Sequence, residues 1–442
     1  MLVRIGNTLA PVYVWWAFGL VWVGVLVWFG RFSMDPDALS YLDLGSAAAR
    51  TGPGALLNGQ WSPGYPALIA AALTLFHPSP GQEVPLLHLL NFPIFVFAFA
   101  AYAFFFRSWL ETIGASADAK KRLTPFAFFI FLWFAIEFMT VKVLAPDLAV
   151  AGFVFLAAGM VAKLARPETN WKAYAGLGLI LGLGYYMKTP MLPLGLALIA
   201  ILLVWPPSPN VSRKKLLLAA LVALLAAAPL AALLSRQAGH FSVGESGRLN
   251  YLWHVNGIQQ YVGWTGDSGN RYGAPLHPIR RLMEKPLTLE FAAPIGGTYP
   301  LWYDPAYWYA GAAPRLDWRQ QLATLRRNLR GYFTLGLWMS GLLAGAAALW
   351  ILALWRGREP VKGTSSPASR ETRWLLAWPL AAYLMYALLY VDYRYVGAFL
   401  AVFWLSKYTP LVLRVSARAS TAVLACLLLA HALPAAGRTA WN

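Results

Sequence analysis

The chain has 442 residues, of which 59% are hydrophobic and only 12% are charged, and its formal net charge is +18 at pH 7. Soluble domains carry about 25% charged residues, so this composition excludes an ordinary soluble protein and predicts a polytopic membrane protein. The positive charge does not indicate a nucleic-acid partner, because most lysine and arginine residues lie in short segments between long apolar runs. The single cysteine, Cys426, lies in the last apolar run, which excludes an intrachain disulfide and a thiolate metal cluster.

The apolar runs predict an all-α membrane fold, because they are long, rich in Leu, Ala and Phe, and lack the alternation of barrel strands. The first run, 11–29, follows Arg4 and has no small-residue cleavage site after it, so we expect an uncleaved first helix. Further apolar segments are predicted at 64–76, 86–106, 124–141, 147–165, 173–187, 190–205, 215–234, 332–355, 374–391, 394–412 and 418–434.

Basic residues between the runs predict the orientation of the chain in the membrane. The segments that carry them, and that we expect on the cytoplasmic side, are 107–122, 163–172, 213–215, 356–373 and 414–418. Segment 64–76 has 13 residues, whereas a span needs about 20, so we predict an interfacial helix on the outer side. The prediction is then about eleven transmembrane helices, with the N-terminus in the cytoplasm of what we expect to be a bacterial inner membrane.

Three parts follow from this reading. Residues 1–234 form a transmembrane module whose first outer loop, 30–85, holds juxtamembrane helices. Residues 235–331 form a mixed external loop region, and residues 332–442 form the C-terminal transmembrane helices.

The segment after the first predicted helix carries three carboxylates, Asp35, Asp37 and Asp43, although the whole chain has only 18 acidic residues. A carboxylate cluster at a membrane surface is costly, which indicates a functional site. Pro36 keeps the residue before it out of a helix, so Asp35 is predicted to cap a short helix that begins near Pro36. Asp37 and Tyr41 would then share a face. The alternative is that the acids only cap the helix and stay solvated, and we favour that reading for Asp43.

Three more charged residues are predicted at outer turns between apolar runs: Asp147, Lys188 and Arg394. A lysine or arginine there is placed to meet a phosphate group. The alternatives are an ion pair of Asp147 with Lys142 that only holds a hairpin, snorkelling of Lys188 to the interface, and an exposed Asp392–Arg394 pair of little energetic value.

The region 235–331 is rich in Gly, Pro, Trp and Tyr. Its aromatic and polar side chains, among them Trp264 and His277, suit stacking on sugar rings, but they equally suit a segment that lies on lipid headgroups. No His-x-x-x-His spacing, phosphate-cradling glycine loop or dinucleotide fingerprint is present in the sequence.

These residues together resemble the GT-C superfamily of integral-membrane glycosyltransferases, which includes the protein O-mannosyltransferases and the aminoarabinose transferase of lipid A. The similarity spans 11–205 and, less closely, 374–412. The patterns that carry it are Asp35 and Asp37 before Tyr41, Trp61-Ser62-Pro63-Gly64-Tyr65-Pro66, Pro146-Asp147, Gly184-Tyr185-Tyr186-Met187-Lys188-Thr189 and Tyr393-Arg394-Tyr395.

The resemblance implies a cell-envelope enzyme that takes a sugar from a polyprenyl-phosphate donor on the non-cytoplasmic face. It passes the sugar, with inversion, to a protein, lipid or glycan acceptor. Asp37, or else Asp35, would be the general base, and Lys188 and Arg394 would bind the donor phosphate. Asp35 would otherwise orient the acceptor or join Asp147 in holding Mg²⁺ or Mn²⁺.

The residues that we expect against the substrate are Tyr41, Tyr65 and Tyr395, within the segments that carry the resemblance, and Trp264 and His277, in the external region that the resemblance does not cover. A transporter or flippase for a lipid-linked or anionic solute is the alternative from another class. It ranks second because the candidate residues gather at the outer edge and no half-repeat is present in the sequence.

Overall fold

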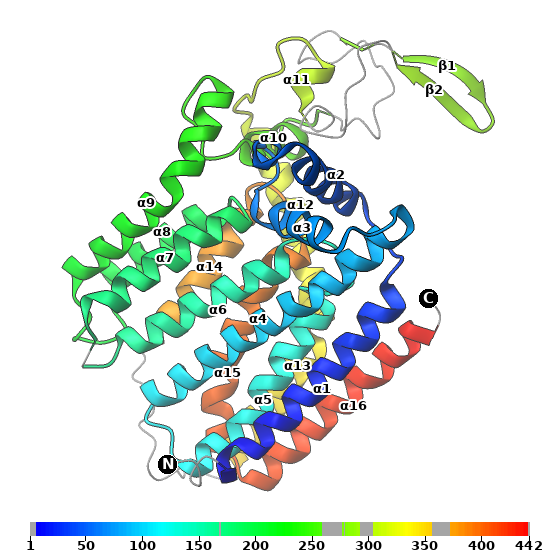
Figure 1. Cartoon of the computed structure of the whole chain (residues 1–442). Coiled ribbons are helices and arrows are strands. Elements are labelled where there is room, and N and C mark those ends of the chain that lie inside the picture. Colours follow the sequence, from blue (N-terminus) through cyan, green and yellow to red (C-terminus); the bar gives the residue numbers. More distant parts are fainter. Residues whose placement is uncertain are drawn as a thin grey trace.

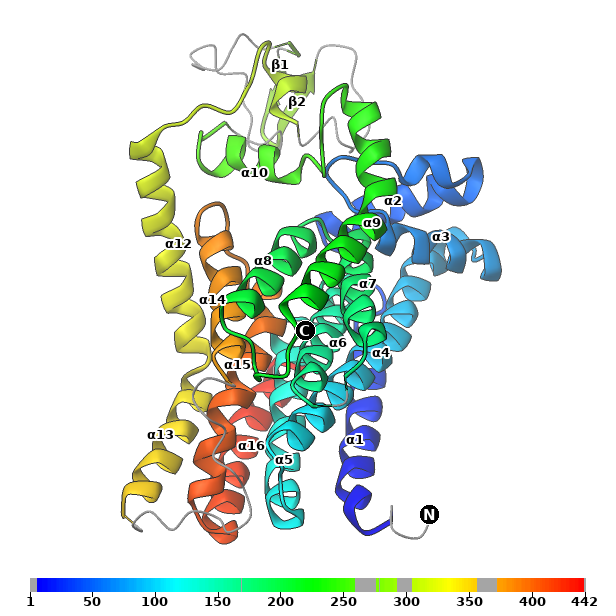
Figure 2. The ribbon, with the colours of Figure 1, turned by 90° about the vertical axis from the view of Figure 1, so that its left-hand side faces the viewer.

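The computed structural model is a bundle of long helices with a smaller layer of helices and one hairpin at one end (Figures 1 and 2). It describes residues 6–167, 169–258, 276–277, 279–291, 304–355 and 372–440. The helices of the bundle are α1 (Gly6–Gly30), α4 (Glu83–Thr112), α5 (Ala117–Glu137), α6 (Asp147–Leu164), α7 (Trp171–Met187), α8 (Met191–Val204), α9 (Arg213–Ala238), α12 (Trp318–Trp338), α13 (Ser340–Trp355), α14 (Trp374–Ala387), α15 (Tyr393–Arg414) and α16 (Ala417–Ala440).

We call the end that carries the smaller layer the α2 end (Figure 1). The elements of this layer are α2 (Pro36–Thr51), η1 (Pro53–Leu56), α3 (Gly64–Phe76), η2 (Pro80–Gln82), α10 (Ser246–His254), α11 (Pro305–Trp308), β1 (Ile279–Glu284) and β2 (Leu287–Phe291). The two strands pair antiparallel, with Ile279 opposite Phe291. The hairpin is an addition to the predicted all-helical fold, and it lies in the external region.

Five of the described helices are long and apolar enough to cross a membrane, which makes the chain an integral membrane protein. They are Val12–Gly30, Pro80–Thr112, Asp147–Leu164, Arg213–Ala238 and Tyr393–Arg414. The bent pair α12 and α13 adds a sixth if it is one span, and α8 and α14 are shorter apolar helices. The count of eleven crossings stays a prediction.

The segment 64–76 is helical over the predicted residues, as α3. It packs beside α2 at the α2 end instead of running along the bundle (Figures 1 and 2). Gly45 allows the close approach of the two helices, because a methyl group at this position would clash with the side chain of Ile69. This placement agrees with an interfacial helix, whose position in a membrane remains a prediction.

The predicted span 332–355 is wrong in its bounds. The structure has two helices here, α12 and α13, which meet at Met339 with a bend of 63°. α12 begins at Trp318, within the predicted external region, because its first turns are capped by Asp317 and continue through a basic, amphipathic sequence. α9 likewise extends beyond the predicted segment, to Ala238.

Small residues bring α7 and α9 together. Gly178 and Gly182 of α7 face Ala219 and Ala223 of α9, and a methyl group on either glycine would meet the backbone of the facing alanine. Lipid tails are as apolar as the side chains, so close packing rather than removal of apolar surface from water stabilises such a seam.

Candidate active site

Asp35 is the N-cap of α2, as predicted. Its Oδ1 atom accepts hydrogen bonds from the backbone N–H groups of Asp37 (3.0 Å) and Ala38 (3.2 Å). The helix begins at Pro36, in agreement with the sequence analysis. One oxygen of this carboxylate is therefore committed to the start of the helix, which fixes the position of Asp37 in the first turn.

Asp37 meets Arg394 from the far end of the chain. The Arg394 Nη2 atom donates to Asp37 Oδ2 at 3.1 Å, although the residues are 357 positions apart in sequence. The Asp37 side chain remains 31% exposed, whereas that of Arg394 is 14% exposed. Burial raises the pKa of the Asp37 carboxyl group, Arg394 acts in the opposite direction, and the net pKa is above the usual value.

Asp147 and Lys188 form a second pair. Asp147 begins α6, Lys188 follows the end of α7, and Lys188 Nζ lies 2.5 Å from Asp147 Oδ1. Asp147 is only 6% exposed, and its second oxygen, Oδ2, lies 4.0 Å from Arg394 Nη1. The partner of Asp147 is thus Lys188 from another hairpin, not Lys142 from its own.

Asp392 completes the group. It caps α15, where its Oδ1 atom accepts from the backbone N–H of Arg394 (2.9 Å) and lies 3.4 Å from Arg394 Nε. Arg394 therefore faces three carboxylates, from α2, α6 and the start of α15. The predicted exposed Asp392–Arg394 pair is wrong in its exposure, because both side chains are largely buried.

We call these residues the charge cluster: Asp37, Asp147, Lys188, Asp392 and Arg394. All of them lie at helix ends on the α2 end of the bundle. The sequence analysis selected four of the five, and the structure brings those four together from α2, α6, α7 and α15. Buried charges are stable only with mutual partners, so an anionic ligand could replace a carboxylate as partner of either cation.

Aromatic residues surround the cluster. Lys188 Nζ lies 3.8 Å from the ring centre of Tyr395, within range of a cation–π interaction. The Tyr41 ring packs edge-on against Trp61 at 4.7 Å and Tyr65 at 5.2 Å. Tyr65 is fully buried, and its hydroxyl donates to Asn91 at 3.0 Å. Tyr65 therefore packs beneath Tyr41 and has no exposed surface in this structure with which to contact a substrate.

Of the two substrate residues predicted in the segment 235–331, the structure describes only His277. Trp264 lies outside the described residues. His277 is buried and stacks on Tyr307, with 4.3 Å between the ring centres. This contact places His277 in the packing of the smaller layer at the α2 end.

Two asparagines that the sequence analysis did not select hold the turns that carry the charge cluster. Asn91 donates to the carbonyls of Val141 (2.9 Å) and Val143 (3.1 Å), just before Asp147. Asn328 donates to the carbonyls of Ala387 (2.8 Å) and Leu389 (3.1 Å), just before Asp392. For Asn91 the signal was available, since it is the one amide side chain of the largely apolar α4 and needs partners when it is buried. Asn328 had no such signal, because the amphipathic α12 also carries Gln320 and Gln321.

The predicted metal ligands are Asp35 and Asp147. In the described part of the chain, no group of three or more His, Cys, Asp and Glu side chains could hold a metal ion. Asp35 caps α2 and Asp147 contacts Lys188, so a divalent cation would have to displace that ammonium group.

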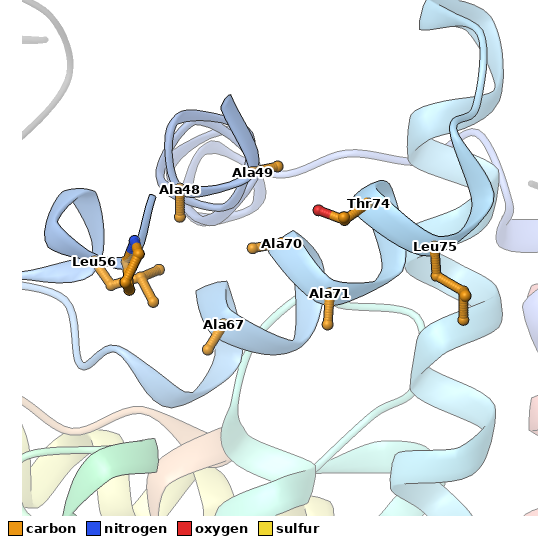
Figure 3. Close-up of a pocket in the computed structure, with 9 residues that line it drawn as sticks. Ala48, Ala49, Leu56, Ala67, Ala70, Ala71, Thr74 and Leu75 are labelled. Atoms are coloured by element: carbon orange, nitrogen blue, oxygen red, sulfur yellow. The ribbon is translucent and has the colours of Figure 1, made fainter. Parts of the chain in front are cut away.

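A cavity of about 420 Å³ lies between α2, η1 and α3 (Figure 3). The residues that line it are Ala48, Ala49, Pro53, Leu56, Ala67, Ala70, Ala71, Thr74 and Leu75. It is apolar and includes none of the charge cluster.

Comparison with known proteins supports the fold. Residues 117–232 match the family model described as dolichyl-phosphate-mannose-protein mannosyltransferase. The crystal structure of ArnT from Cupriavidus metallidurans bound to undecaprenyl phosphate superimposes with a TM-score of 0.50 and 16% identity, over 89% of this chain and 60% of that one. The apo form of the same protein gives a TM-score of 0.48 and 15% identity, over 89% and 59% of the two chains. No curated protein matches the sequence.

Proposed function

We propose that this integral membrane protein, which has the fold of the GT-C membrane glycosyltransferases, transfers a sugar from a polyprenyl-phosphate carrier to an acceptor hydroxyl group. The chain spans about 60% of the length of the ArnT structure that it resembles. The transfer takes place on the non-cytoplasmic face and inverts the configuration at the anomeric carbon.

The observation that carries this proposal is the charge cluster. It combines a carboxylate that keeps contact with solvent, Asp37, with two cations, Lys188 and Arg394, at one end of the bundle. A general base and a pair of cations are what an inverting transfer from a phosphate carrier requires. The raised pKa of Asp37 suits this role, because a stronger base takes a proton from a hydroxyl group more readily.

The reaction has one displacement step. The acceptor hydroxyl loses its proton to the Asp37 carboxylate while its oxygen forms a bond to the anomeric carbon. The bond between that carbon and the carrier oxygen breaks, and the electron pair leaves with the polyprenyl phosphate. Lys188 and Arg394 stabilise the charge that develops on the leaving phosphate.

Donor binding also changes the partners of Asp37. Arg394 donates to Asp37 in the ligand-free structure. A phosphate that takes over the Arg394 guanidinium removes the cation that lowers the pKa of Asp37, so the arrival of the donor makes the base stronger.

The test is transfer from polyprenyl-phosphate sugars by the protein in proteoliposomes, with Asp37→Asn and Asp35→Asn as a matched pair. Asp37→Asn should lower kcat by about 100-fold or more, because the amide cannot accept the proton. Asp35→Asn should stay near the wild type, because asparagine caps a helix as well as aspartate does.

The opposite result, with Asp35→Asn inactive and Asp37→Asn active, would move the base to Asp35. Binding of the lipid-linked sugar with no transfer by the wild type, together with its movement between leaflets, would favour the transporter alternative.

A further inference from the structure

Three aromatic rings lie in a row between the charge cluster and α10 of the smaller layer. Tyr395, beside Lys188, lies 6.3 Å from the ring of Tyr390, and Tyr390 stacks on His254 at 4.5 Å with an angle of 12° between the rings. The Tyr390 side chain is 37% exposed. Part of its surface is therefore accessible beside the charge cluster.

Side chains of α12 fix the backbone at both members of the stacked pair through hydrogen bonds. The carbonyl of His254 accepts hydrogen bonds from Thr324 Oγ1 (2.7 Å) and Arg327 Nη2 (2.9 Å). The turn that ends at Tyr390 is held by Gln321, which donates to the Leu388 carbonyl at 2.8 Å, and by Asn328. Figure 2 shows α12 running beside α14 with α10 above them. The pair is thus fixed before any ligand binds, which lowers the entropy cost of binding.

We propose that the stacked rings of Tyr390 and His254 are the platform on which a saccharide ring of the acceptor lies, so that the acceptor is a glycan. The inference rests on the proposed function, because it places the nucleophilic hydroxyl of that glycan at Asp37. The C–H face of a pyranose packs on a flat aromatic ring, and rigid aromatic side chains provide large contact areas at low entropy cost.

The surroundings favour a sugar over an acyl chain or an anionic group. Thr324 and Arg327 of α12 donate to the His254 carbonyl, and Gln321 and Asn328 donate to the turn before Tyr390, so polar side chains lie next to the pair. The described hydrogen bonds of Arg327 use only its Nη2 atom, and the side chain is exposed, so further N–H donors remain for sugar hydroxyls. Burial and the neighbouring Arg327 lower the pKa of His254 to about 4, so the imidazole is neutral at neutral pH and gives a ring surface without charge.

The experiment measures binding of methyl glycosides of glucose, galactose and mannose to the full chain in nanodiscs, by saturation-transfer NMR. Tyr390→Ala should weaken the binding of the preferred glycoside about tenfold, whereas Tyr390→Phe should keep it. Trp318→Ala is the matched control, because Trp318 is an aromatic residue of α12 that is 68% exposed and has no described contact with Tyr390 or His254. Its glycoside binding should match the wild type.

Two outcomes would refute the proposal that Tyr390 and His254 bind a saccharide. In the first, Tyr390→Ala and the wild type bind the glycosides equally well. In the second, the wild type binds a serine-containing hexapeptide and none of the glycosides. Undecaprenyl phosphate binding, measured on the same samples, shows that Tyr390→Ala is folded when it equals the wild-type value. It also separates the two proposals. If the wild type binds undecaprenyl phosphate but no glycoside, the proposed function stands and the platform is refuted. If it binds a glycoside but not undecaprenyl phosphate, the platform stands and the proposed function is refuted.

Discussion

Arg394 lies at the N-terminus of α15, where the helix dipole disfavours a cation. Its side chain is also largely buried, with only 14% exposed, so water does little to stabilise the charge. The other charges of the cluster have the sign that their helix ends favour: Asp37 and Asp147 lie at N-termini and Lys188 at a C-terminus. Arg394 therefore depends on its carboxylate neighbours. A residue that is stable only through exchangeable partners is well suited to receive a phosphate.

In the proposed mechanism Asp37 must be ionised to act as base, so the pH dependence of transfer should follow the pKa of Asp37. Because this pKa is raised, kcat should fall on acidification with a midpoint above about 3.9, the ordinary value for aspartate. Arg394→Gln removes a cation that lowers the pKa of Asp37 in the ligand-free protein, so the acid limb of kcat/KM, which reports the free enzyme, should move to higher pH.

The control for this shift is Arg330→Gln, which changes an exposed arginine of α12. Its acid limb should coincide with that of the wild type. An acid limb that stays in place in Arg394→Gln would separate the titrating group from Asp37.

At the scale of elements, two helices position the site through amide side chains. α4 holds the turn before α6 through Asn91, and α12 holds the turn before α15 through Asn328. Asp147 and Asp392 lie at the ends of these two turns. The distance between them therefore depends on the hydrogen bonds of Asn91 and Asn328, which belong to neighbouring helices.

Asn328→Ala should test this dependence. The change leaves the carbonyls of Ala387 and Leu389 without their described donor, at a cost of about 1–3 kcal/mol. We expect a lower melting temperature and a higher KM for the donor, since the turn before Arg394 loosens. Asn210→Ala, at an exposed asparagine of the opposite end, should change neither quantity. Wild-type stability and kinetics in Asn328→Ala would show that the turn is held by other contacts.

Local signals explain which elements could be predicted. The cap at Asp35 and the proline after it define the start of α2, and the proline and glycine before Tyr65 define α3. The hairpin was missed because its alternation, Leu287, Leu289 and Phe291, is short and lies in a region that we read as loop. The bend between α12 and α13 was missed because the apolar pattern continues through Met339, although the Ser340-Gly341 pair that follows is a typical site of a kink.

On the scale of the whole molecule, the two ends of the bundle differ in charge. The turns between α4 and α5, between α6 and α7, and between α8 and α9 all lie at the end opposite to the α2 end (Figure 1). Basic residues lie in the helix ends that flank these turns, among them Lys120, Lys163, Lys172 and Lys214. The charge map of the sequence thus predicted which turns share an end. It could not give the pairing of Asp37 with Arg394, because that contact depends on how distant helices pack.

Cysteine labelling tests the orientation. In a Cys426→Ser background, Pro80→Cys should react with a membrane-impermeant maleimide from the non-cytoplasmic side. Lys120→Cys, near the start of α5, should react only after the membrane is opened. Labelling of Pro80→Cys from the cytoplasmic side would mean that α3 crosses the membrane.

The excess of carboxylates around Lys188 and Arg394 also bears on turnover. After transfer, the free polyprenyl phosphate carries close to two negative charges at neutral pH, whereas the sugar-linked donor carries one, since a phosphate monoester has a second pKa of about 6. The product is therefore attracted more strongly than the donor to the same cations. Asp37, Asp147 and Asp392 stay next to Lys188 and Arg394 and compete for them from within the protein. On the proposed function, re-formation of these pairs would favour release of the spent carrier and limit inhibition by the product.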